Sequence, residues 1–127
     1  MITIPVSVGE LIDKLSILHV KQTKINNPEK LVYVNKEFEL LYNFSSVYLN
    51  NDEISKLYHE LVDTNSKLWE IEDKLRIIET EKTFDSKFVE LSRSVYLTND
   101  KRFRLKTEIN ERTSSEIREV KEYVKYN

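Results

Sequence analysis

The sequence predicts an all-α fold: a long antiparallel helical hairpin with two shorter N-terminal helices packed on it, resembling a four-helix bundle. The first observation is composition, because 127 residues include one Gly, two Pro and 33% charged residues, which leaves few turn formers for a β fold. The second is a pair of long stretches with apolar residues every three or four positions. The third is the short connection between them, which favours a fold-back. The length predicts one helical domain over residues 1–127.

The first residues predict a short extended lead-in and then a helix. Apolar residues alternate over residues 1–8, and Pro5 disfavours a helix there. Ser7 and Glu10 have the spacing of a capping box, in which each residue's side chain bonds the other's backbone N–H. The first helix is therefore expected over residues 8–26.

A second helix is expected over residues 28–43. Asn27 suits its N-cap, and Pro28 suits the first helical position, where a missing backbone N–H costs nothing. Residues 43–51 carry no clear apolar period, so the sequence gives no assignment for them.

Two long amphipathic helices, over residues 52–82 and 85–113, form the predicted hairpin. Their apolar positions recur with a period near 3.5, which is typical of coiled coils. A fold-back at Thr83 sets residues of the two helices at equal height, in the pairs Leu75–Leu91, Leu57–Ile109 and, as a salt bridge, Asp73–Arg93.

The C-terminal residues predict a further short helix over residues 116–125. Thr113 and Glu116 have capping-box spacing, and apolar residues follow at positions 117, 120 and 124.

The predicted hairpin is longer than the helices available to cover it. Each of its helices is about 40 Å long at about 1.5 Å per residue, and the two N-terminal helices are clearly shorter. A homodimer would supply the missing cover, so we expect one.

Composition excludes several functional classes. The chain has no Cys, which excludes disulfides and thiolate metal sites and suits a reducing, cytoplasmic location. No run of about 18 apolar residues exists to span a membrane, so no membrane association is expected. A formal net charge of −2 lacks the basic excess of a nucleic-acid-binding protein, so a nucleic-acid partner is not expected. The single glycine excludes Gly-rich phosphate loops.

Acidic residues spaced three apart are the candidate metal ligands. Such a pair places two carboxylates on one helix face, and all-helical nucleotide pyrophosphohydrolases hold Mg²⁺ with pairs from two helices. The alternative is an ordinary charged surface, because a chain with 22 acidic residues contains such pairs by chance. We expect no cofactor, and the residues that would hold Mg²⁺ if it bound are Glu10, Asp13, Glu70 and Asp73.

Polar residues interrupt both apolar seams of the hairpin at one height. This polar layer contains Thr64, Asn65, Thr98, Asn99 and Arg102. One interpretation is structural, because a polar layer specifies the register of paired helices. The other is a ligand site, with Arg102 as a bidentate donor to an anion and Asn65 and Asn99 as orienting groups. In both cases the guanidinium needs a partner, either the carboxylate of Glu10 or Asp13 or an anion in a cleft.

Trp69 is a further candidate ligand-binding residue. It follows the seam residue Leu68, a position where an indole commonly anchors the packing between helices. The alternative is a platform on which a base or a sugar stacks.

Several strings in the chain carry a resemblance to a known family. They are IPVSVGELIDKL at residues 4–15, LWEIED at 68–73, LSRSVY at 91–96 and ND at 99–100. Together they resemble a small helical protein family of unknown function found in bacteria and marine phages, over nearly the whole chain. One departure is Ser92, where a small Ala is expected. The resemblance implies a helical fold and a bacterial or phage source, and it implies no activity.

Two functional hypotheses remain compatible with the sequence. The first is a non-enzymatic protein-interaction or accessory factor, encoded by a phage and acting on an unidentified protein partner. The second is a small Mg²⁺-dependent nucleotide hydrolase using the acid pairs, or an anion- or nucleotide-binding module using Arg102. The sequence leaves open whether the chain is an enzyme.

Overall fold

The computed structural model describes residues 1–126. It is all-α, as predicted, and the described residues contain no strand. Four helices follow one another along the chain: α1 Val8–Lys24, α2 Pro28–Leu49, α3 Asp52–Glu81 and α4 Ser86–Arg112. None of the described helices is both long enough and apolar enough to cross a membrane.

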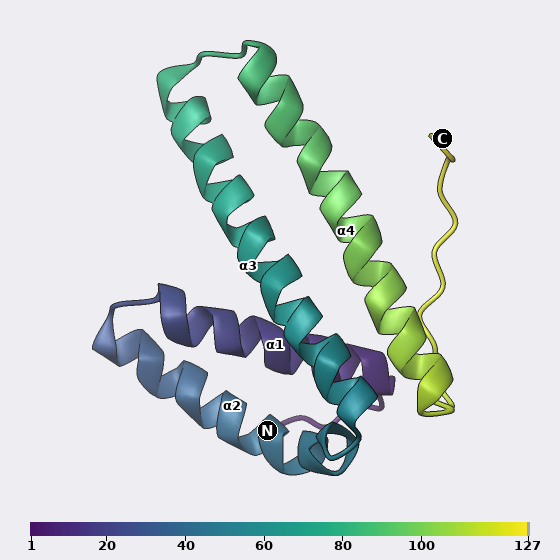
Figure 1. Cartoon of the computed structure of the whole chain (residues 1–127). Coiled ribbons are helices and arrows are strands. Elements are labelled where there is room, and N and C mark those ends of the chain that lie inside the picture. The colour runs from purple at the N-terminus through teal and green to yellow at the C-terminus, as the bar shows by residue number, and fades with distance from the viewer. Residues whose placement is uncertain (127) are drawn as a thin grey trace.

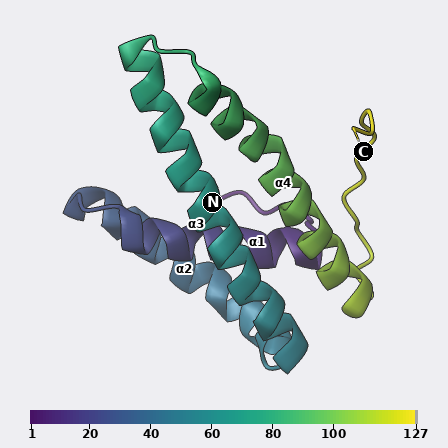
Figure 2. The ribbon, with the colours of Figure 1, turned by 45° about the horizontal axis from the view of Figure 1, so that its top comes forward.

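The helices form two pairs that cross each other. Helices α3 and α4 run in opposite directions on either side of the loop that joins them (Figure 1). Helix α1 contacts α2, α3 and α4, whereas α2 contacts α1 and α3. The α1–α2 pair lies across the end of the hairpin where α3 begins, and the loop end extends beyond it (Figures 1 and 2).

Side-chain caps start each helix. The Ser7 hydroxyl accepts a hydrogen bond from the Glu10 backbone N–H at 3.0 Å, which confirms the predicted start of α1. Asn27 caps α2 with Pro28 at its first position, also as predicted. Asn51 and Asp85 cap α3 and α4 in the same way.

Helix α2 is longer than the predicted 28–43, because it continues through the unassigned residues to Leu49. Its buried face passes through Ser45, which has no solvent exposure. The Ser45 hydroxyl donates to the Leu41 carbonyl oxygen at 2.8 Å, so a polar residue occupies a core position. This serine interrupts the apolar period, and the sequence pattern is lost there.

The predicted helix over residues 116–125 is wrong. The residues after α4 form no helix up to residue 126, and we call residues 113–126 the tail. The Thr113 hydroxyl donates back to the Ile109 carbonyl oxygen at 2.7 Å, so the expected capping box with Glu116 does not form. Ser114 then takes a φ of 52°, in the left-handed region, and turns the chain away from the axis of α4.

The hydrophobic core lies where α1, α3 and α4 meet. Leu57 and Ile109, predicted to face each other, belong to the same buried cluster, whereas Leu75 and Leu91 are only half-buried. Asp73 and Arg93 are exposed, and no ion pair joins them in the described chain, so that expectation fails. The buried cluster consists of Ile12, Leu15, Ile54, Leu57, Tyr58, Leu61, Leu105 and Ile109.

Truncation at the centre of this core is expected to destabilise the fold. Leu61 has no solvent exposure, so Leu61→Ala should lower the free energy of unfolding by about 2–5 kcal/mol in a urea titration followed by circular dichroism. Val32→Ala is the matched control, because Val32 is 64% exposed and its truncation should change stability by less than about 0.5 kcal/mol. Equal effects of the two substitutions would contradict this location of the core.

Candidate functional site

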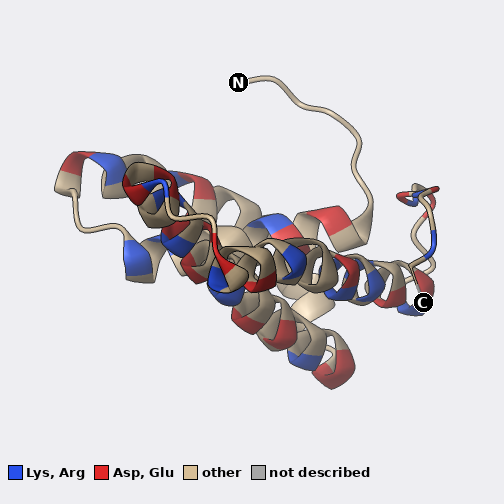
Figure 3. Ribbon diagram, turned by 90° about the horizontal axis from the view of Figure 1, so that it is seen from above, with Lys and Arg blue, Asp and Glu red and all other residues tan. Residues whose placement is uncertain are grey.

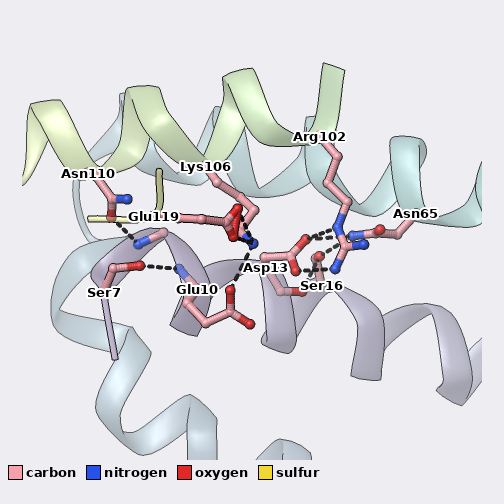
Figure 4. Close-up of polar contacts among 10 residues, drawn as sticks. Ser7, Glu10, Asp13, Ser16, Asn65, Arg102, Lys106, Asn110 and Glu119 are labelled. Atoms are coloured by element: carbon pink, nitrogen blue, oxygen red, sulfur yellow. Dashed lines mark hydrogen bonds and ion pairs between the residues drawn. The ribbon is translucent and has the colours of Figure 1, made fainter. Parts of the chain in front are cut away.

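A fully buried carboxylate, that of Asp13 in α1, forms the centre of the polar site. Its side chain has no solvent exposure, and Arg102 from α4 binds it through two nitrogens on one edge of the guanidinium (Figure 4). The Arg102 Nε donates to Oδ1 at 2.9 Å, and Nη2 donates to Oδ2 at 2.6 Å. This bidentate geometry is the strong form of a charge-assisted hydrogen bond. The expectation that Arg102 pairs with a carboxylate from the first helix is confirmed.

Asn65 in α3 connects the third helix to the same carboxylate. Its Nδ2 donates to Asp13 Oδ1 at 3.0 Å and to the Ser16 hydroxyl oxygen at 2.9 Å. The Ser16 hydroxyl in turn donates to the Asp13 carbonyl oxygen at 2.5 Å. No buried side-chain nitrogen or oxygen of the described residues lacks a hydrogen-bond partner. The network therefore satisfies its buried polar groups, as a buried charge requires.

The contact between α1 and α4 continues from Asp13 toward the start of α1. The Gly9 backbone N–H donates to Asn110 Oδ1 at 2.6 Å. Between these two pairs, the Lys106 ammonium contacts Glu10 Oε2 at 2.8 Å (Figure 4). We call this row of polar contacts the α1–α4 seam, which is distinct from the apolar seams between the two helices of the hairpin.

Helical spacing explains why these residues meet. Gly9 and Asp13 are four residues apart on α1, which places them on one face. Arg102, Lys106 and Asn110 are spaced by four on α4 and share a face in the same way. The two faces meet with opposite chain directions, since residue 9 bonds residue 110 whereas residue 13 bonds residue 102.

Both cations of the seam keep their charge. The hydrogen bonds from Arg102 to Asp13 raise the pKa of the guanidinium, although burial opposes this. Burial alone would lower the pKa of the Lys106 ammonium, but hydrogen bonds to Glu10 and Glu119 outweigh it and raise that pKa. Asp13 already neutralises the charge of Arg102, so the guanidinium is not an open anion-binding group.

The predicted ligand-binding residues line one shallow cleft. Asn65, Trp69, Asn99 and Arg102 share a depression of about 270 Å³ with Glu72. Its remaining lining is apolar, from Ile17, Val20 and Leu68. The structure thus brings all four residues together, although the hydrogen bonds of Asn65 and Arg102 are directed at Asp13. The other two members of the polar layer, Thr64 and Thr98, are buried.

The four acidic residues named as possible Mg²⁺ ligands do not come together. Glu10 contacts Lys106, and Glu70 contacts Lys24 at 3.1 Å, while Asp73 is exposed. Within residues 1–126, no group of three or more acids or histidines is placed to hold a metal ion. Three of the four acids therefore act as partners of basic side chains.

Three residues of the seam were not predicted from the sequence: Gly9, Lys106 and Asn110. The spacing of four between Arg102, Lys106 and Asn110 is the signal that could have identified the last two. For Gly9 the signal was its uniqueness, as the only glycine in the chain. A side chain there would place its Cβ 2.5 Å from the Lys106 carbonyl oxygen, so glycine permits the close approach of α1 and α4.

Comparison with known proteins identifies a family but no activity. The model of a family of unknown function, DUF6165, matches residues 2–126. No curated protein matches the chain, and no solved structure matches it.

Removal of the arginine is expected to leave a buried charge without its main partner. Arg102→Leu should lower the free energy of unfolding by about 3–5 kcal/mol, because the Asp13 carboxylate would keep only the amide of Asn65. Arg104→Leu on the same helix is the control, since Arg104 is exposed and its loss should matter by less than about 0.5 kcal/mol. The free energies of unfolding of both variants are measured by chemical denaturation. An Arg102→Leu variant as stable as Arg104→Leu would contradict a stabilising role for the Asp13–Arg102 pair.

The glycine of the seam provides a separate test. Gly9→Ala should destabilise the protein by about 1–3 kcal/mol even though alanine is the better helix former, because the methyl group would collide with the backbone of α4. The thermal midpoint should fall accordingly. A rise in the midpoint would show that helix propensity outweighs the collision and that the seam can widen.

Proposed function

The chain belongs to the DUF6165 family of unknown function, and from its geometry we propose a non-enzymatic interaction protein that binds helices of a partner through the loop end of the α3–α4 hairpin. We call residues 72–97 the hairpin arm. We propose a second copy of the chain as its partner, in a homodimer located in the cytoplasm.

The observation that carries this proposal is an arm without cover from the rest of the chain. Helix α3 has 30 residues and α1 has 17, so at about 1.5 Å per residue α3 is roughly 20 Å longer. The arm extends past α1 and α2 in both views (Figures 1 and 2). Two helices alone bury little apolar surface, so an arm of this kind gains stability from further helices.

Apolar side chains of the arm are exposed to solvent. Ile77 is 57% exposed and lies beside Ile78 and Leu91 in a groove of about 280 Å³ between the two helices. A cluster of this kind is typical of protein-interaction surfaces. Other large apolar residues of the arm with more than two fifths of their surface exposed are Phe84, Val89, Tyr96 and Leu97.

The charges around the groove favour a second copy as the occupant. The rim of the groove carries two basic residues, Lys74 and Lys87, and two acidic residues, Glu81 and Asp85. In a two-fold symmetric dimer, the same surface meets itself, so each cation of one rim can face an anion of the other. Acidic and basic residues are interspersed along the helices more generally (Figure 3), which does not favour a polyanion as the partner.

The alternative of a nucleotide hydrolase has less support. Asp13 neutralises Arg102, so using this carboxylate to hold Mg²⁺ would leave the guanidinium uncompensated, and Glu10 is already bound to Lys106. The cleft beside Trp69 is shallow, and the guanidinium on its wall is bound to Asp13.

The molar mass in solution tests the proposal. Sedimentation equilibrium should show a concentration-dependent dimer for the wild-type chain and a monomer for Ile77→Glu, because a carboxylate at the centre of the groove would lose its hydration when the two surfaces meet. The variant should keep its thermal midpoint, since Ile77 is more than half exposed in the monomer.

Val32→Glu on α2 is the matched control, as it adds the same charge at an equally exposed apolar position outside the arm and should leave the dimer intact. A wild-type monomer at all concentrations, or loss of the dimer in both variants alike, would overturn the arm as a self-association surface.

A further inference from the structure

The tail reaches back along α4 and places a carboxylate on a buried ammonium group. Glu119 Oε2 lies 3.0 Å from Lys106 Nζ, and Oε1 lies 3.4 Å from it (Figure 4). Only 8% of the Lys106 side chain is exposed, and its other partner is Glu10 of α1. Lys106 is therefore held between one carboxylate on a helix and one on an irregular segment.

A small polar cavity surrounds this contact. Its volume is about 160 Å³, and basic groups dominate its lining. Lys121 contributes a third cation from the tail, with its ammonium 5.0 Å from the centre of the Phe103 ring. The lining consists of Asn99, Arg102, Phe103, Lys106, Glu119 and Lys121.

Charge compensation in this cluster depends on the tail. Asp13 balances Arg102, and Glu10 balances Lys106, which leaves Glu119 to balance Lys121. When the Glu119 carboxylate is removed and Lys121 stays in the lining, the cavity has a net positive charge, and the Lys106 ammonium has an unoccupied direction for a hydrogen bond. In a partly buried site, such a charge attracts an anion more strongly than it would in bulk water.

The two carboxylates on Lys106 differ in their freedom to leave. Glu10 lies in the first turn of α1, which the Gly9–Asn110 contact fixes to α4. Glu119 belongs to the tail, which is exposed along most of its length and forms no helix. Few polar contacts hold the tail, among them the Val8 N–H to Ser115 hydroxyl bond at 3.1 Å and one from the Tyr126 hydroxyl to Asp100.

We propose that Glu119 occupies an oxyanion site, and that a carboxylate or phosphate group of a ligand takes its place on Lys106 when the Glu119 side chain turns away from the cavity. The tail is then a built-in competitor for that ligand. A cavity of about 160 Å³ suits one anionic group, since whole drug-sized ligands occupy about 300–1,000 Å³. Asn99 and Lys121 line the same cavity and supply further hydrogen-bond donors, whereas Arg102 stays bound to Asp13.

Titration with inorganic phosphate, and separately with acetate, at constant ionic strength tests this site. Glu119→Gln removes the competing charge and should bind phosphate about tenfold or more tightly than wild type, the value of one charge-assisted hydrogen bond. Glu122→Gln is the matched control, because it removes the same charge from an exposed position of the tail outside the cavity and should bind as wild type does. Amide chemical shifts of α4 residues report the binding.

Tryptic cleavage of the tail provides the second measurement. Phosphate should accelerate cleavage after Arg118 and Lys121 in the wild-type chain, because it displaces Glu119, and Glu119→Gln should be cleaved quickly without phosphate. Stronger binding of phosphate than of acetate would identify a phosphate-bearing ligand, and the reverse would identify a carboxylate-bearing one. If Glu119→Gln is less stable and gains no affinity for either anion, the role of Glu119 is to hold the tail against α4, and the proposal is wrong.

Discussion

The fold depends on the neutralisation of one buried carboxylate, that of Asp13. Asp13 loses all contact with water when α1 packs against the hairpin, and burying an unpaired charge would cost more than the marginal stability of a small domain allows. Arg102 and Asn65 reach the same carboxylate from α4 and α3. This requirement favours the observed crossing point of the three helices, because here the carboxylate accepts hydrogen bonds from both α3 and α4.

The position of that crossing point determines what the rest of the chain can do. With Asp13 opposite Arg102, the close contact at Gly9 aligns α1 with the end of α4 and brings Lys106 beside the tail. The same alignment leaves α1 too short to reach the loop end of the hairpin, so the arm stays uncovered. The proposed oxyanion site and the proposed dimer surface, which lie on different parts of α4, are thus two consequences of one buried ion pair.

Periodicity and charge made part of this structure predictable from the sequence. Apolar spacing predicted the four helices of the structure together with a fifth that does not form. The cost of an unpaired guanidinium in an apolar seam predicted a partner for Arg102, either a carboxylate of the first helix or an anion in a cleft, and the structure has the carboxylate. The end of α2 could not be predicted, because Ser45 satisfies its hydroxyl within its own helix and packs in the core as an apolar residue would. The tail was missed for the related reason that the Thr113 hydroxyl bonds the preceding turn and not the following one. Local hydrogen bonds of this kind compete with patterns that sequence spacing alone suggests.

A double-mutant cycle between Asp13 and Arg102 tests the central claim most directly. The free energies of unfolding of Asp13→Asn, Arg102→Leu and the double variant, measured by urea denaturation, give the coupling between the two side chains. For a bidentate, largely buried pair, we expect the double variant to lose less free energy of unfolding than the two single variants lose together. The expected difference is about 1.5–3 kcal/mol. Additive losses, with a coupling near zero, would show that the two residues act independently and that the helices are held at their crossing point by apolar packing alone.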